Sequence, residues 1–337
     1  MDIQRRIQLG HGGGGKLTGR LIRELIVPLL DRGHLRALPD SVVLDNLGDR
    51  LAYTTDSYVV SPLFFPGGDI GSLAVHGTCN DLACSAARPL FLSLGLILEE
   101  GFPFETLERI LASAAVAADR NGVEIVTGDT KVVPRGAADG IFVNTSGIGR
   151  VEVDIVPSVA RISVGDAVLV SGPVGNHGLA VMLSRAEFSF DFAIESDSMS
   201  VWPVVERLLE LGTELKFLRD PTRGGLAATL NEIASGTGKS VAVDESVIPM
   251  DEAVVAASEI LGIDPLVAAN EGKIVAVVGR NSAEKAIELL HECPMSPRAA
   301  IIGHITEQHP ARVILQTRIG GSRILPEPSG ELLPRIC

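Results

Sequence analysis

Two kinds of apolar segment alternate along this chain, and their alternation restricts its fold more than any other feature. Short runs rich in branched and aromatic residues predict strands, whereas longer runs with apolar residues at helical spacing predict helices. The predicted strands cover 50–60, 90–100, 123–133, 273–278 and 311–317, and the predicted helices cover 17–33, 71–87 and 104–122. This mixture favours a layered α/β or α+β architecture.

The length of the chain bears on how many cores it forms. Its 337 residues exceed what one hydrophobic core usually organises, so two domains are expected. A new unit opens near Pro157, because 164–183 reads as a strand, a glycine-containing turn and a helix. We therefore predict an N-terminal domain at 1–156, a C-terminal domain at 157–325 and a flexible tail at 326–337.

Charge and cysteine usage narrow the class of protein. A net charge of −13 argues against nonspecific nucleic-acid binding, which needs a basic surface. The first residues lack the apolar core of a signal peptide and no long apolar run follows, so we expect no membrane span and a cytoplasmic location. The cysteines form no CxxC pair and are expected to be reduced, with Cys79 and Cys84 in the core, Cys293 structural and Cys337 at the end of the chain.

A glycine-rich stretch, His11 to Gly19, invites a phosphate-loop interpretation. With Gly10 it nearly matches the P-loop pattern, but Leu17 stands where a hydroxyl that binds Mg²⁺ is required. The GxGxxG match is weak because no good strand leads into it. Four consecutive glycines followed by Lys16 remain compatible with a mobile lid over phosphates, and equally with a segment that has no role.

Four aspartates lie at breaks between regular elements. Taken singly, Asp56, Asp81, Asp129 and Asp220 are each explained by helix capping. Taken together, they are the hard oxygen ligands that hold Mg²⁺ while it bridges phosphate oxygens. A metal of this kind would also reconcile an acidic protein with an anionic ligand.

Two further ionisable residues lie close to glycine, where a ligand can approach the backbone. Lys131 in GDTK can orient an anion, and Glu271 in NEGK can act as a base if a cleft desolvates it. The alternatives are a surface salt bridge for Lys131 and a helix cap for Glu271.

Long motifs across the whole chain resemble one family. HGGGGKLTGRLI, AYTTDSYVVSPLFFPGGDIGSLAVHGTCNDLA, LSLGLILEEGFP, IVTGDTKVV, LRDPTRGGLAATLNEIA, DPLVAANEGK and the terminal PRIC are similar to the hydrogenase maturation factor E family, the carbamoyl-cysteine dehydratases. That family belongs to a superfamily with aminoimidazole ribonucleotide synthetase and selenophosphate synthetase. The resemblance implies an α+β, PurM-like fold in each of two domains.

The resemblance also implies an activity and its partners. A carbamoyltransferase loads a carbamoyl group onto the terminal cysteine, and the dehydratase uses ATP and Mg²⁺ to convert it into a thiocyanate. The cyanide then passes to iron on a scaffold complex for [NiFe]-hydrogenase assembly. Related proteins are homodimers with nucleotide sites between their N-terminal domains.

Site residues follow from the same resemblance. It implies that Cys337 is the modified residue and that Lys131 and Glu271 assist proton removal. It implies metal binding by Asp40, Asp56, Asp81 and Asp220. The residues implied to bind the nucleotide are Lys16, Asp56, Asp81, Thr127, Gly128 and Asp129. Relatives commonly have paired acids where this chain has Pro39 and Asp40. The glycine loop lacks the cysteine or selenocysteine of selenophosphate synthetases, so no selenide chemistry is expected.

The tail that carries Cys337 suits such transfer. From Pro326 its residues could extend to roughly 40 Å, and its prolines stiffen it. Arg335 is expected to favour the reactive thiolate. Two other functions remain open: a small-molecule kinase or ligase that needs no terminal thiol, and a non-catalytic carrier that uses only the tail for docking.

Overall fold

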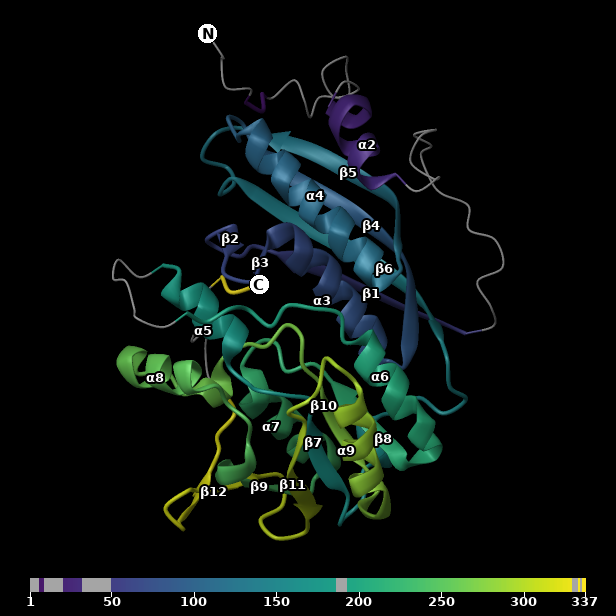
Figure 1. Ribbon diagram of the computed structural model, residues 1–337, viewed down its shortest axis with the longest axis vertical. Coiled ribbons are helices and arrows are strands. Elements are labelled where there is room, and N and C mark those ends of the chain that lie inside the picture. The colour runs from purple at the N-terminus through teal and green to yellow at the C-terminus, as the bar shows by residue number, and fades with distance from the viewer. Residues whose placement is uncertain (1–5, 9–20, 32–49, 186–192, 329–332, 334) are drawn as a thin grey trace.

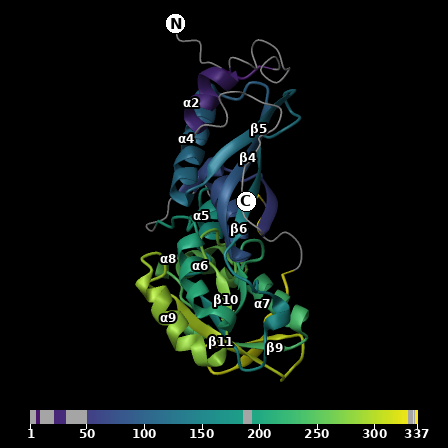
Figure 2. The same ribbon diagram turned by 90° about the vertical axis from the view of Figure 1, so that its right-hand side faces the viewer.

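The structure is a computed structural model that describes residues 6–8, 21–31, 50–185, 193–328, 333 and 335–337. Two β-sheets lie one above the other along its long axis, and helices pack against each (Figures 1 and 2). The predicted site residues Lys16 and Asp40, and the glycine-rich stretch between 11 and 16, lie outside these residues. The chain passes from the first sheet to the second between residues 152 and 166.

The first sheet has four strands in the order β1-β6-β4-β5. Their bounds are β1 Leu51–Tyr58, β4 Ala87–Glu99, β5 Glu124–Val133 and β6 Ile141–Val151. The β4–β5 pair is parallel, whereas β6 is antiparallel to both β1 and β4. A parallel pair needs a crossover connection, and helix α4 between β4 and β5 provides it. β1 and β5 therefore form opposite edges of the sheet.

Two helices, α3 Ile70–Cys84 and α4 Phe104–Asn121, pack together on this sheet. Asp69 begins α3 through a capping box, in which its side chain accepts hydrogen bonds from Gly71 N and Ser72 N. Gly122 ends α4 in the left-handed conformation with φ +65°, which suits a residue without a side chain. Shorter elements complete the unit: η2 Ile22–Ile26, α2 Val27–Leu30, β2 Phe64–Phe65 and β3 Gly68–Asp69.

The second sheet has seven strands in the order β13-β12-β9-β11-β7-β10-β8. Every pair is antiparallel except β9–β12. The strands are β7 Ala167–Val170, β8 Leu215–Arg219, β9 Ser240–Asp244, β10 Val275–Val278, β11 Ala300–Thr306, β12 Val313–Gln316 and β13 Ser322–Ile324.

Helices cover both faces of this sheet. Alternate residues of β10 divide between two cores: Val275 and Val277 pack with α7, while Ala276 and Val278 pack with α6 and α9. The helices are α5 Asn176–Leu183, α6 Trp202–Leu208, α7 Gly225–Thr237, α8 Glu252–Leu261 and α9 Ala283–Glu292, and the short helical turns are η3 Val159–Arg161, η4 Leu209–Glu214, η5 Glu245–Val247, η6 Pro265–Val267 and η7 Arg280–Ser282.

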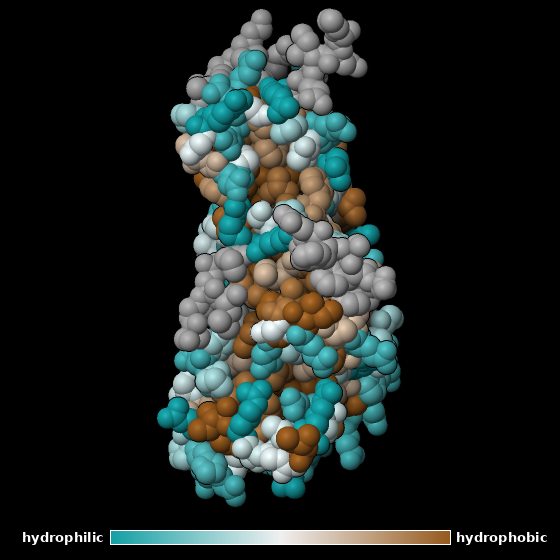
Figure 3. Space-filling model, turned by 90° about the vertical axis from the view of Figure 1, so that its left-hand side faces the viewer, coloured by the Kyte–Doolittle hydropathy of each residue, from teal (hydrophilic) through white to brown (hydrophobic). Residues whose placement is uncertain are grey.

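The observed elements confirm the predicted α+β layering. The predicted helices at 71–87 and 104–122 and the predicted strands at 50–60 and 123–133 match α3, α4, β1 and β5 within a few residues. No helix of the described chain is long and apolar enough to cross a membrane. On the side shown in Figure 3, hydrophobic patches interrupt a hydrophilic surface, as is usual for a folded domain.

Candidate functional site

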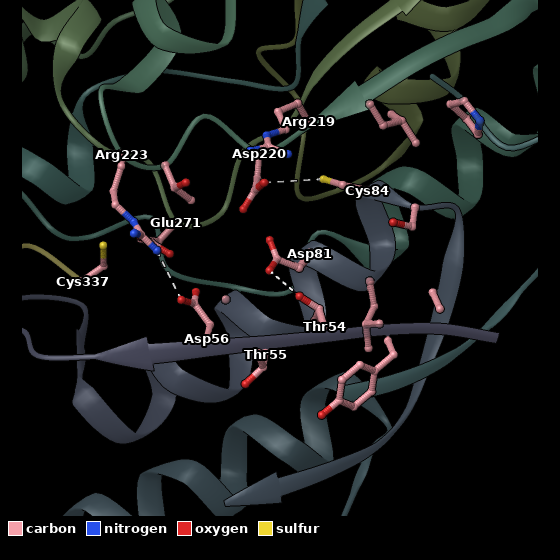
Figure 4. Close-up of a pocket in the computed structure, with 18 of the residues that line it drawn as sticks. Thr54, Thr55, Asp56, Asp81, Cys84, Arg219, Asp220, Arg223, Glu271 and Cys337 are labelled. Atoms are coloured by element: carbon pink, nitrogen blue, oxygen red, sulfur yellow. Dashed lines mark hydrogen bonds and ion pairs between the residues drawn. The ribbon is translucent and has the colours of Figure 1, made fainter. Parts of the chain in front are cut away.

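A cavity of about 670 Å³ brings together residues from both sheets and from the end of the chain (Figure 4). β1 and α3 form one wall, and the end of β8 with the loop before α7 forms the other. The polar residues that line it are Thr54, Thr55, Asp56, Asp81, Cys84, Ser85, Arg219, Asp220, Thr222, Arg223, Glu271 and Cys337. Five predicted site residues, Asp56, Asp81, Asp220, Glu271 and Cys337, therefore share one cavity.

Close packing of α3 on β1 forms the first wall. Gly77 faces the buried Tyr58 so closely that an added Cβ would lie 2.3 Å from the phenol oxygen. Glycine at this position lets the helix approach the strand. Thr54 Oγ1 then donates a hydrogen bond of 3.0 Å to Asp81 Oδ2, which places Asp81 beside Asp56.

Burial and mutual repulsion change the ionisation of the carboxyl groups. Asp220, directly after β8, is 7% exposed, and burial followed by the charge of Asp81 raises its pKa to about 7. Burial also raises the pKa of Asp81, with a further rise from Asp56. The cavity thus concentrates negative charge that a bound cation would relieve.

These carboxylates suit Mg²⁺ in chemistry but do not form a closed metal cage. Among the residues that the structure describes, no three histidine, cysteine or acidic side chains are grouped closely enough to hold a metal ion by themselves. Mg²⁺ usually binds through one or two carboxylates together with substrate phosphates and water. Separated acidic ligands around an open cavity fit that mode.

Arg223, in the DPTRGG motif, is a site residue to which the sequence analysis assigned no role. Its Nη2 lies 3.3 Å from Asp56 Oδ1, and its guanidinium faces the Cys337 thiol (Figure 4). The glycines that follow it were the available signal, because they mark a position where backbone lies close to other groups. Arg223 therefore connects the acidic wall to the end of the chain.

Glu271 is held in place through its backbone rather than its side chain. Asn80 Nδ2 donates a hydrogen bond of 3.0 Å to its carbonyl, and its N–H donates one of 3.2 Å to Asp197 Oδ1. The side chain is 3% exposed, and Oε1 has no hydrogen-bond partner in the structure. Burial, and then the charge of Asp220, raise the pKa of Glu271 well above its usual value. Such a carboxyl group is suited to accept a proton.

The last residues of the chain lie in the site. Ser61 N donates a hydrogen bond to Arg335 O at 3.2 Å, and Val59 N donates one to the terminal Cys337 O at 3.4 Å. This short pairing with residues 59–61 brings the half-buried Cys337 thiol to the cavity.

The ionisation of the thiol differs from the expectation. Burial raises the pKa of Cys337 to about 12, Glu271 adds to the rise, and Arg223 opposes it. The expectation that Arg335 favours the thiolate is wrong here, because its guanidinium bonds Asp139 and Val59 O instead. Cys337 is therefore a neutral thiol while the tail occupies the site.

Four predicted site residues lie on β5, at the sheet edge opposite β1. Lys131 and Asp129 form an exposed ion pair of 3.5 Å, and Thr127 and Gly128 precede them on the strand. An added Cβ at Gly128 would lie 2.3 Å from Leu94 O, so close strand packing also requires this glycine. None of the four lines the cavity within one chain.

The other cysteines are placed as follows. Cys79 is buried, as expected, and Cys293, which was expected to be structural, is buried too. Cys84 packs against the core but also lines the cavity, where its Sγ lies 3.9 Å from Asp220 Oδ1. Its expected place wholly inside the core is therefore corrected, because the last turn of α3 reaches the rim of the cavity.

Comparison with known proteins gives two domain matches that cover most of the chain. Residues 39–151 match the family model described as AIR synthase related protein, N-terminal domain. Residues 163–316 match the corresponding C-terminal domain.

Individual relatives align over nearly the whole length. The "Carbamoyl dehydratase HypE" of Rhizobium leguminosarum bv. viciae is 49% identical over 335 residues, covering 98% of this chain and 95% of that protein. A crystal structure of hydrogenase maturation protein HypE in complex with ATP has a TM-score of 0.94 and 47% identity, covering 98% of this chain and 100% of that one. A chain from a HypE–HypF complex has a TM-score of 0.80 and 46% identity, covering 91% and 99%.

Proposed function

The chain belongs to the carbamoyl dehydratase HypE family, and on that premise we propose that it dehydrates an S-carbamoyl group on its own Cys337 to a thiocyanate, using ATP. The single observation that carries the proposal is the position of the Cys337 thiol, in the same cavity as three carboxylates and the desolvated Glu271 (Figure 4). The product is the cyanide donor for the iron centre of [NiFe]-hydrogenase. A terminal thiol seated in its own enzyme's cavity serves as a substrate group.

The proposed reaction removes one oxygen and two protons from the carbamoyl group. The C–O bond breaks and a C≡N bond remains on sulfur, while the oxygen leaves with phosphate and ADP is released. ATP supplies the phosphoryl group that turns a poor leaving oxygen into a good one. Asp56, Asp81 and Asp220 would hold the Mg²⁺ that accompanies its phosphates.

Glu271 is suited to receive a proton from the carbamoyl nitrogen. Its raised pKa makes the carboxylate a stronger base than an exposed glutamate, and its free Oε1 can accept a proton without losing an existing hydrogen bond. Arg223 lies between Asp56 and the sulfur, where a cation favours oxygen that carries negative charge.

We propose that a homodimer completes the nucleotide site. Asp56 and Lys131 lie on opposite edges of the four-stranded sheet, three strand spacings or roughly 14 Å apart. In the proposed N-terminal domain, 1–156, the apolar side chains of Leu51, Tyr53 and Ile97 are exposed, as an interface requires. A second copy packed on this sheet would bring the β5 residues Thr127, Gly128, Asp129 and Lys131 to the cavity, where Lys131 would assist proton removal.

Two further partners follow from the chemistry. A carbamoyltransferase must load Cys337, and the HypE–HypF complex among the similar structures supports such a partner. An iron-carrying scaffold of the same pathway would receive the cyanide. Three expectations stay predictions from the sequence. They are the cytoplasmic location, nucleotide binding by Lys16 and metal binding by Asp40.

Intact-protein mass spectrometry tests the function directly. The wild type is incubated with carbamoyl phosphate, Mg²⁺, ATP and the carbamoyltransferase, in parallel with Cys337→Ala, Glu271→Gln and the control Cys293→Ala. The wild type and the control should gain one carbamoyl group and then lose one water. Cys337→Ala should gain nothing, and Glu271→Gln should stop at the carbamoyl stage.

Two outcomes would refute the proposal. Modification of Cys337→Ala would show that the tail is not the substrate. A wild type that consumes ATP yet stays unmodified would favour the kinase-like alternative.

A further inference from the structure

One buried histidine, His177 in α5, connects the tail to the body of the protein. It is 0% exposed, and its Nε2 lies 2.9 Å from the main-chain oxygen of Ile336, the residue before the terminal cysteine. Its Nδ1 lies 2.8 Å from Ser196 Oγ. Its ring also forms a T-shaped pair with the ring of Phe65, with centroids 5.4 Å apart and planes at 85°. His177 therefore contacts the tail, the first domain and a connecting segment at once.

The neighbours of the two ring nitrogens determine the tautomer. A carbonyl oxygen can only accept, so Nε2 carries the proton and donates it to Ile336 O. Ser196 Oγ accepts a hydrogen bond of 3.0 Å from Ser198 N, and its hydroxyl hydrogen is free for Nδ1. Burial lowers the pKa of His177, which agrees with a neutral ring.

The helix that carries His177 is joined to the segment that carries Glu271. Gly178 N donates a hydrogen bond of 2.9 Å to Ala269 O, and Gly175 N donates one of 2.7 Å to Asn270 Oδ1. An added Cβ at Gly178 would lie 2.9 Å from Ala269 N, so the contact between helix and segment is close. Through these contacts, the hydrogen bond to Ile336 places the tail relative to Glu271.

We propose that His177 is a positioning residue, whose Nε2–H···O=C hydrogen bond to Ile336 seats the tail and holds the Cys337 sulfur beside Glu271. The role in dehydration rests on the proposed function, whereas the seating of the tail does not. The tail must leave this seat to be loaded by a transferase and return to it to be dehydrated.

Packing alone does not account for a histidine here. A phenylalanine would keep the contact with Phe65, but it would leave the buried Ile336 carbonyl without this donor and Ser196 Oγ without its acceptor. Ile336 is 5% exposed, so water does not readily replace the lost donor. The polar contacts of the ring thus favour the seated tail specifically.

The reactivity of Cys337 toward N-ethylmaleimide tests, without any substrate, whether His177 holds the tail in the cavity. In the seated state the raised pKa of the thiol suppresses alkylation, so the rate reports how often the tail leaves. His177→Phe should raise the alkylation rate at Cys337 roughly five- to tenfold, as expected for one lost buried hydrogen bond. His177→Gln places an amide donor near the position of Nε2 and should restore most of the protection.

His76→Phe is the matched control. His76 is also buried, at 3% exposure, and bonds Asn121 through Nδ1, but it does not contact the tail. The alkylation rate of Cys337 in His76→Phe should equal that in the wild type. Equal rates in His177→Phe and the wild type, or the same rise in His76→Phe, would overturn the proposal.

A second measurement separates this proposal from the proposed function. Single-turnover dehydration of a preloaded tail should slow in His177→Phe by a factor similar to the gain in alkylation, recover in His177→Gln, and leave the KM for ATP unchanged. If the wild type shows no dehydration while Cys337 is alkylated faster in His177→Phe and not in His177→Gln, the dehydratase function is refuted but the role of His177 in holding the tail is supported. If His177→Phe dehydrates the tail at the wild-type rate although its Cys337 is alkylated faster, the positioning role in the reaction is refuted.

Discussion

Asp220→Asn should make the metal-free protein more stable above neutral pH. In the wild type, burial and the neighbouring Asp81 raise the pKa of Asp220 to about 7, whereas an unfolded aspartate titrates near 3.9. Between these two values the folded state binds the proton and the unfolded state does not. The free energy of unfolding therefore falls as pH rises through that window and becomes level above it. An asparagine has no proton to lose.

The size of the effect follows from the difference in pKa. About three pKa units at about 1.4 kcal/mol each correspond to roughly 4 kcal/mol above pH 7. This figure is an upper limit, because Asp81 shares the same repulsion and takes up part of the titration. We expect the stability of the variant relative to the wild type to grow by about 2–3 kcal/mol between about pH 5 and about pH 8.

Urea unfolding at several pH values, with a chelator present, measures this difference. Asp244→Asn is the control, because hydrogen bonds from Ser246 lower the pKa of Asp244 and its carboxylate is exposed. That change should not stabilise the protein at high pH. If the difference in free energy of unfolding between Asp220→Asn and the wild type is the same at about pH 5 and about pH 8, the raised pKa inferred for Asp220 is wrong. The variant should also lose Mg²⁺-dependent activity.

Four other substitutions, at three positions, test the packing of the two domains by urea or thermal unfolding. Lys273→Met should cost about 3–5 kcal/mol, because it removes the 3.3 Å partner of the buried Asp197 carboxylate; a loss below about 1 kcal/mol would contradict the pair's importance. Gly71→Ala should cost about 1–3 kcal/mol, since its Cβ would lie 2.2 Å from Ile110 O, and an unchanged Tm would show that the helices can separate freely. Asp69→Ala should cost about 1 kcal/mol by removing the cap of α3, whereas Asp69→Asn should cost less.

Local patterns predicted the regular elements well where short-range physics determines them. The helix at 104–122 has apolar residues at helical spacing and a glycine at its end, and both signals act within the segment itself. The edge strand at 123–133 needs only its branched residues to be recognised. The motifs also identified which acids to examine. The expectation that all of them lie at breaks between regular elements is wrong, because Asp56 lies inside β1 and Asp81 inside α3, and only Asp220 follows the end of a strand.

The patterns along the chain were enough to predict two layered units, the acidic candidates and the importance of the last cysteine. They could not show that Asp220 and Asp81 share a cavity with Cys337, that Lys131 lies at the opposite sheet edge, or that His177 bonds the tail. Each of these facts depends on pairings between segments far apart in the chain, which spacing along one segment does not encode. Burial raises the pKa values of Asp220 and Cys337 and removes water from the hydrogen bond between His177 and Ile336. This burial exists only once the two domains pack together.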